Sequence, residues 1–139
     1  MSGADLVRRC VDAINRGDAA AYAAEFTADA VIHDPSYPHP LKGREAIQAD
    51  IAVLLRAVPD IRGTIRSVVS DGDQVAAEVT FQGTNTEPYV TPQGEVPPTG
   101  RPVSLHLHDH VELGPDGQAA EERRYYDTAA FYTQFGVTA

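Results

Sequence analysis

Residues 101–136 read RPVSLHLHDHVELGPDGQAAEERRYYDTAAFYTQFG and contain a strand, a turn, a second strand and a short helix. Polar and apolar residues alternate along Arg101–Leu113, as in a strand with one buried face. The Gly114–Gly117 segment favours a tight turn, and Gln118–Asp127 follows as the second strand. A short helix is expected from Thr128 to Gln134. This stretch predicts an antiparallel hairpin that leads into a helix.

A second hairpin precedes the first. Ile61–Ser70 and Gln74–Asn85 alternate on either side of Asp71-Gly72, which is a strong hairpin signal. Residues 86–100 hold four of the ten prolines, so we expect a long loop there. Loops of this length in compact domains are as a rule functional or mobile.

The N-terminal part of the chain is mainly helical in pattern. Ser2 and Asp5 form a capping box, and an apolar stripe at helical spacing follows (Leu6, Cys10 and Ile14, with Val7 and Val11). A short helix capped by Asp18 is expected to carry Tyr22 and Phe26. A strand over residues 28–34 comes next, and a third helix runs from Gly43 to Pro59.

These elements predict one α+β domain over residues 1–139, in which three N-terminal helices pack on one face of a curved, mostly antiparallel sheet. Twenty acidic residues against eleven basic ones give a formal charge of −9, which disfavours binding to nucleic acid or to an acidic membrane surface. The N-terminus shows no signal-peptide pattern, so we expect a cytoplasmic protein. The single cysteine, Cys10, rules out an internal disulfide and suggests packing in the first helix.

Three histidines alternate along one strand, so His106, His108 and His110 share a face with Glu112. Histidines at i and i+2 can bind one metal ion. The spacing resembles the first half of a cupin metal motif, but no histidine follows to supply the second half. A polar strand face is the simpler interpretation, and no metal site is predicted.

Asp127 lies where the last strand meets the last helix. A carboxylate at the mouth of an apolar cavity has a raised pKa and can serve as a general acid or base. Asp also caps helices well, and the spacing alone favours a cap.

Several segments match, in order, the pattern of one protein family. They are His33-Asp34-Pro35, Gly43-Arg44-Glu45-Ala46-Ile47, Val58-Pro59-Asp60-Ile61, Pro97-Pro98-Thr99-Gly100-Arg101-Pro102-Val103, Tyr126-Asp127 and Gln134-Phe135-Gly136. Together they resemble the SnoaL-like polyketide cyclases (ester cyclases) of the NTF2-like superfamily. The chain departs from that pattern at Asn85, where the family often has His, and at Arg123, where it often has an aromatic residue.

The resemblance implies a cone-shaped fold with a deep pocket and a homodimer formed through the outer face of the sheet. It also implies that Asp127 is the acid/base in an intramolecular aldol closure, without a metal or organic cofactor. Relatives on this fold include ketosteroid isomerases, epoxide hydrolases and proteins that only bind ligands, so the fold alone does not define the activity.

The pairing of the C-terminal hairpin bears on the site. A two-residue turn places His106 opposite Asp127 and His110 opposite Arg123, whereas a four-residue loop places His106 opposite Tyr125. An odd loop or a bulge reverses the faces. The other face of this strand is apolar, and if that face is buried in the core the histidine face points outward. Its residues are Val103, Leu105, Leu107, Val111 and Leu113. We favour His106 and His108 in the pocket.

The leading hypothesis is a cofactor-independent cyclase of a polyketide-like, hydrophobic carbonyl substrate. Asp127 relays the proton, and His106 orients it or stabilises the oxyanion. The candidate substrate-binding residues are Tyr22, Phe26, His33, Tyr37, Phe81, Asn85, His108, Arg123 and Tyr125.

Three other classes stay open. One is a ligand-binding dimer without chemistry. Another is an isomerase or an epoxide hydrolase on the same fold. The third is a metal enzyme that uses the histidine strand. An epoxide hydrolase of this kind needs an Asp-Arg-Asp set, for which Asp127 and Arg123 are the evident members and Asp34 or Asp109 the candidates for the third.

Overall fold

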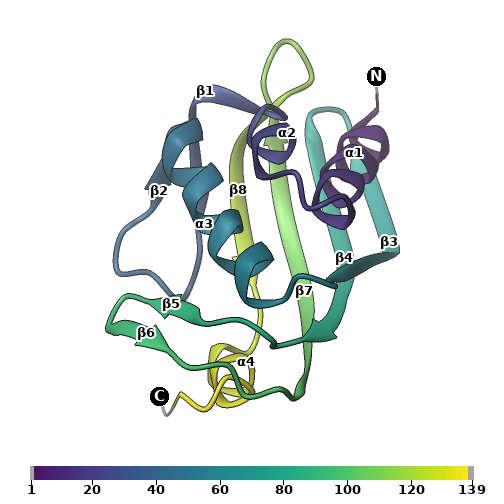
Figure 1. The fold of residues 1–139 in the computed structure, drawn as a ribbon. Coiled ribbons are helices and arrows are strands. Elements are labelled where there is room, and N and C mark those ends of the chain that lie inside the picture. The colour runs from purple at the N-terminus through teal and green to yellow at the C-terminus, as the bar shows by residue number, and fades with distance from the viewer. Residues whose placement is uncertain (1, 138–139) are drawn as a thin grey trace.

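The computed structural model describes residues 2–137, and its centre is a curved sheet with helices on its concave face (Figure 1). Six strands lie in the order β2-β1-β8-β7-β4-β3, and β1 and β8 form the one parallel pair of this sheet. The predicted α+β class is confirmed. The elements are α1 (Gly3–Asn15), α2 (Ala19–Ala23), β1 (Phe26–His33), β2 (Leu41–Lys42), α3 (Arg44–Ala57), β3 (Arg62–Asp71), β4 (Gln74–Thr84), β5 (Tyr89–Thr91), β6 (Gly94–Val96), β7 (Pro102–Leu113), β8 (Ala119–Tyr125) and α4 (Thr128–Thr133).

The capping box predicted at the start of α1 is present, since Ser2 and Asp5 each accept a bond from the other's backbone N–H. The apolar stripe of α1 faces β3 and β4. Gly63 allows this close approach, because a Cβ there would lie 2.7 Å from the Phe81 ring and 3.1 Å from Val11. No helix within residues 2–137 is long and apolar enough to cross a membrane.

Two local expectations differ from the structure. Phe26 opens β1 instead of ending α2, although its ring centroid still lies 5.3 Å from that of Tyr22. The predicted loop at 86–100 contains a small hairpin, β5–β6. Tyr89 of that hairpin is buried against Phe135, with ring centroids 4.3 Å apart, and this aromatic contact holds the hairpin against the segment that follows α4.

The face of β7 that lines the pocket is the opposite of the predicted one. His106 and His108 are exposed on the outer face, while the odd-numbered residues of the strand face the helices. The expectation that His106 and His108 lie in the pocket is therefore wrong, because burying the row of Val and Leu side chains is more favourable than burying imidazoles.

The pairing of β7 with β8 explains why His106 does not meet Asp127. His110 pairs with Arg123, as a two-residue turn predicts, and a bulge follows at Glu112/Leu113. However, β8 ends at Tyr125. His106 therefore has its neighbour on β4, where Thr80 Oγ1 lies 3.4 Å from Nδ1.

Candidate active site

A cavity of about 110 Å³ lies between the helices and the concave face of the sheet. Most of its wall is apolar, because α1, α3 and the inner faces of β4 and β7 contribute aliphatic and aromatic side chains. These include Leu6, Cys10, Val11, Ile51, Leu54, Val79, Phe81, Leu105 and Leu107. An apolar enclosure of this kind lowers the local dielectric and strengthens every charge interaction inside it.

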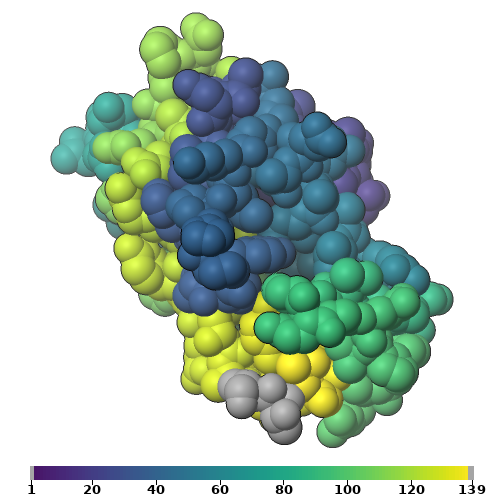
Figure 2. Space-filling model, turned by 90° about the vertical axis from the view of Figure 1, so that its left-hand side faces the viewer, coloured from purple at the N-terminus to yellow at the C-terminus, as the bar shows by residue number. Residues whose placement is uncertain are grey.

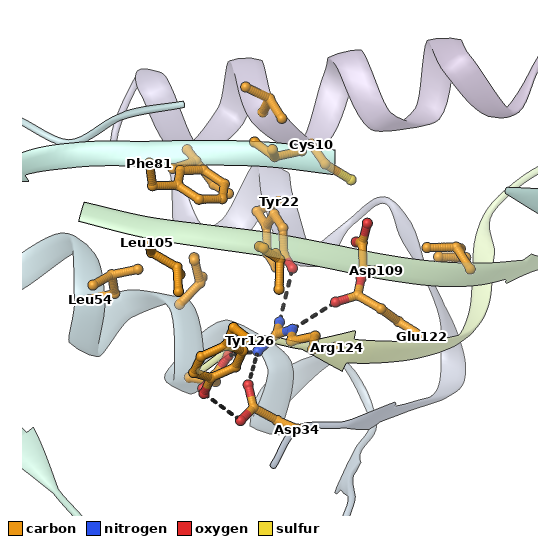
Figure 3. A pocket seen from close by; sticks show the side chains of 18 of the residues that line it. Cys10, Tyr22, Asp34, Leu54, Phe81, Leu105, Asp109, Glu122, Arg124 and Tyr126 are labelled. Carbon is orange, nitrogen blue, oxygen red and sulfur yellow. Dashed lines mark hydrogen bonds and ion pairs between the residues drawn. The ribbon is translucent and has the colours of Figure 1, made fainter. Parts of the chain in front are cut away.

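Arg124 stands at the centre of a buried ionic cluster at one side of the cavity (Figure 3). Its Nη1 donates to Asp34 at 3.0 Å and to Asp50 at 2.8 Å, and its Nε donates to Glu122 at 2.6 Å. The side chain of Arg124 is 9% exposed, and those of Asp34 and Glu122 are 5% and 6% exposed. One cation therefore faces three carboxylates, so the site has an excess of negative charge.

Asp34 is held as a carboxylate by its hydrogen bonds. Burial opposes its ionisation, but Arg124 and the hydroxyl groups of Tyr126 and Ser36 hold the pKa of Asp34 below its usual value. Tyr126 donates to Asp34 at 2.7 Å. Because its oxygens already accept four bonds, Asp34 is suited to positioning neighbours more than to taking a proton.

Two further tyrosines complete the polar side of the cavity. Tyr37 donates to Asp50 at 2.7 Å, and the Tyr22 hydroxyl oxygen accepts from Arg124 Nη2 at 3.1 Å. Burial raises the pKa of both tyrosines, so both remain protonated. The O–H of Tyr22 has no acceptor among the described residues, and Tyr22 lines the cavity, so its proton is available to a ligand.

Asp109 interrupts the apolar row of β7 between Leu107 and Val111. Its Oδ1 atom is buried and has no hydrogen-bond partner in the described part of the chain. Burial raises the pKa of Asp109 well above its usual value, and the negative charge of Glu122 adds to the effect while Arg124 opposes it. A carboxyl group with a raised pKa and a free oxygen in an apolar pocket is equipped for proton transfer.

The structure separates the residues proposed from the sequence into three groups. Tyr22, Phe26, Tyr37 and Phe81 line the cavity. His33, Arg123 and Tyr125, with Tyr37, line a separate groove on the surface. The Asn85 side chain is buried in bonds to the backbone, donating to the carbonyl oxygens of Ala57 and Glu87 and accepting from Thr99 N.

Asp127 lies outside both hollows. It is exposed and caps α4, where it accepts from Ala130 N at 3.0 Å. The interpretation that the spacing alone favoured, an N-cap, is confirmed. A catalytic role for Asp127 stays a prediction, and the structure gives it no contact with the cavity.

Sequence reasoning missed the roles of Arg124, Glu122 and Asp50. Successive side chains of a strand point to opposite faces, so only one of two neighbouring arginines can face the cavity. Arg124 faces inward, and Arg123 faces outward. One feature of the sequence could have indicated the site, because Asp109 is an acidic residue in the otherwise apolar row of β7. Over residues 2–137, no group of three or more His, Cys, Asp and Glu side chains is arranged to hold a metal ion.

Comparison with solved structures supports the fold at high coverage. A protein from Jannaschia sp. CCS1, described as a SnoaL-like polyketide cyclase, aligns with a TM-score of 0.82 at 23% identity, over 99% of this chain and 93% of that one. IdmH from Streptomyces antibioticus, described as a polyketide cyclase, aligns with a TM-score of 0.77 at 27% identity, over 99% and 100% of the two chains. SalBIII, described as epoxide hydrolase/cyclase-like and linked to pyran ring formation in salinomycin, aligns at 22% identity and a TM-score of 0.71, over 91% of each chain.

No curated protein matches the sequence significantly. The family model described as SnoaL-like polyketide cyclase matches residues 4–135, which is nearly all of the chain. The structural similarity to the Jannaschia protein and to IdmH, over 99% of this chain, agrees with that match. The chain belongs to the SnoaL-like polyketide cyclase family.

Proposed function

We propose that the protein closes a ring in a hydrophobic carbonyl substrate by acid/base catalysis, with Asp109 as the proton relay. The observation that carries this proposal is that Asp109 lines the apolar cavity and that its buried Oδ1 has no hydrogen-bond partner among the described residues. Neighbouring Glu122 is negative, so the ionised form of Asp109 is a stronger base than an ordinary carboxylate.

The reaction is an intramolecular aldol closure in which the proton that Asp109 removes is returned to the product. Ionised Asp109 takes a proton from the carbon next to one carbonyl group, which leaves an enolate. The enolate carbon forms a bond to the second carbonyl carbon, and Asp109 returns its proton to the resulting alkoxide. The enzyme ends in its starting state, and the product is a cyclic hydroxyketone.

Tyr22 serves as the oxyanion donor in this scheme. Its hydroxyl oxygen accepts from Arg124, which polarises the O–H toward a ligand oxygen. A fixed donor directed at the developing charge is a large contribution to catalysis in a cavity that excludes water. Asp34 and Asp50 hold the Arg124 guanidinium in place through the two bonds to its Nη1 atom.

A second candidate is ring closure by opening an epoxide, and the Asp34–Arg124–Asp50 arrangement favours it. An epoxide hydrolase of this fold is expected to use an Asp-Arg-Asp set, and Asp34, Arg124 and Asp50 line the cavity in place of the expected Asp127 and Arg123. SalBIII, whose structure resembles this chain, is described as epoxide hydrolase/cyclase-like. In this reaction, protonated Asp109 would donate to the epoxide oxygen while a carboxylate of the cluster takes the proton of the attacking hydroxyl.

The pH profile of turnover separates the two reactions. Closure of an aryl diketone to its cyclic hydroxyketone, followed by NMR, reports the aldol reaction, and an aryl epoxy-alcohol reports the epoxide reaction. The aldol proposal requires ionised Asp109, so its rate rises with pH through a raised pKa. Turnover of the epoxy-alcohol alone, at a rate that falls as pH rises, would support the second candidate instead.

A further inference from the structure

A groove of about 570 Å³ opens on the surface beside the cavity. It lies between the end of β8 and the segment that joins β1 to β2, on the side of the molecule that faces the viewer in Figure 2. Asp34, Tyr37, Arg124 and Tyr126 line both the groove and the cavity. The two hollows are therefore neighbours that share one polar wall.

The cavity has little room for a large substrate. Its volume of about 110 Å³ is of the order of an apolar cavity of ~150 Å³ that takes up benzene. One small ring fills it. A substrate of polyketide size must continue past the shared wall, and the groove is the adjoining space.

The groove contains polar side-chain groups that have no partner among the described residues. Glu121 holds His33 Nε2 at 2.7 Å and Arg123 Nη2 at 3.2 Å, which places these two side chains together at the rim. The remaining N–H groups of Arg123, and the polar atoms of His39 and Tyr125, have no partner within residues 2–137. Asp34, the carboxylate that lines the groove, already accepts four bonds.

We propose that the groove is a second subsite, which binds an oxygen-rich chain ending in a carboxylate on a substrate whose ring occupies the cavity. This inference rests on the proposed function, since the ring in the cavity is the part that reacts. Arg123 is the main recognition residue because it is always charged, 41% exposed and able to bind a carboxylate with two N–H groups.

Titration calorimetry with unreactive probes tests the subsite. Phenylbutyrate carries a ring and a carboxylate at the far end of a chain, and phenylbutanol has the same shape without the charge. We expect phenylbutyrate to bind about three- to tenfold more tightly than phenylbutanol. Arg123→Gln should abolish that preference and leave the affinity for phenylbutanol unchanged.

Arg8→Gln is the matched control. It removes the same charge from α1, at an exposed position paired with Asp5 and outside the groove, and should preserve the preference. Phenylacetate is too short to pass the shared wall, so its affinity should not depend on Arg123. Equal binding of acid and alcohol, an equal loss in both variants, or the same Arg123 dependence for phenylacetate would overturn the proposal.

The proposed function and the subsite fail separately. The probes do not react, so a wild-type protein that binds them as expected but closes no ring refutes only the proposed reaction. A protein that closes the ring of the aryl diketone but shows no carboxylate preference refutes only the subsite.

Discussion

Arg124 and Asp34 are 90 residues apart in the chain, yet Nη1 of Arg124 donates to Oδ2 of Asp34 at 3.0 Å. The bond joins the end of β8 to the residue after β1, the parallel pair of the main sheet. Both side chains are nearly inaccessible. The contact therefore closes one side of the cavity and neutralises part of the charge that burial would otherwise make unfavourable.

Arg124→Met should destabilise the protein by about 3–5 kcal/mol, because it leaves buried carboxylates without their cation. Urea unfolding followed by circular dichroism measures this. Arg123→Met is the control, since Arg123 is 41% exposed in a pair with Glu121, and a surface pair of this kind contributes about 0–1 kcal/mol. Equal destabilisation by the two substitutions would contradict the buried-cluster interpretation.

Asp34 should make the protein sensitive to acid. Its pKa in the folded state lies below the ordinary value of 3.8, so its contribution to stability is present above that value and is lost as pH falls through the lowered pKa. We expect the melting temperature of Asp34→Asn to be lower than that of the wild type near neutral pH. The difference should narrow below about pH 4, where the wild type loses the same interaction. A difference that stays constant with pH would exclude this role.

Asp109 should make the protein less stable as pH rises, which is the opposite of the effect of Asp34. Its pKa is raised, so the folded state retains the proton, and stability falls as pH rises from the ordinary value of 3.8 through the raised pKa. Asp109→Asn keeps the shape without the charge, and should stabilise the protein by about 1 kcal/mol or more at alkaline pH. That gain should vanish near pH 4. Thermal unfolding across this range checks the sign, and an Asp109→Asn variant that is less stable at alkaline pH would show that Asp109 ionises readily.

The sequence predicted more of the fold than of the site. Alternation around Asp71-Gly72 and the capping box of Ser2 and Asp5 are local signals, and the structure contains both. The hairpin at 89–96 was missed because three-residue strands among prolines carry almost no periodic signal, and its position depends on the contact between Tyr89 and Phe135.

The site was harder to predict because it depends on which face of a strand is buried. The three alternating histidines suggested a catalytic face. However, the apolar face of the same strand, which contains Leu105, Leu107 and Val111, is the buried one, and Asp109 lies on that face. Asp50 lies on α3 and reaches Arg124 across 74 residues of sequence, which no local pattern indicates.

Asp127 should contribute to stability through its cap. Asp127→Ala should lower the stability by about 1 kcal/mol, because α4 loses the acceptor for Ala130 N, while Asp127→Asn should retain most of it. Urea unfolding of the two variants measures this difference. If Asp127→Asn is as unstable as Asp127→Ala, the carboxylate has a role beyond capping.

The rate at which the protein exchanges the α-protons of an aryl methyl ketone in D2O, followed by NMR, tests the central claim most directly, because it reports the proton transfer without requiring ring closure. Wild-type exchange should accelerate with pH through a raised pKa. Asp109→Asn should slow it about one hundred- to ten thousandfold, and Asp127→Asn should leave it unchanged. Exchange that survives in Asp109→Asn and is lost in Asp127→Asn would contradict the account and restore Asp127 as the acid/base.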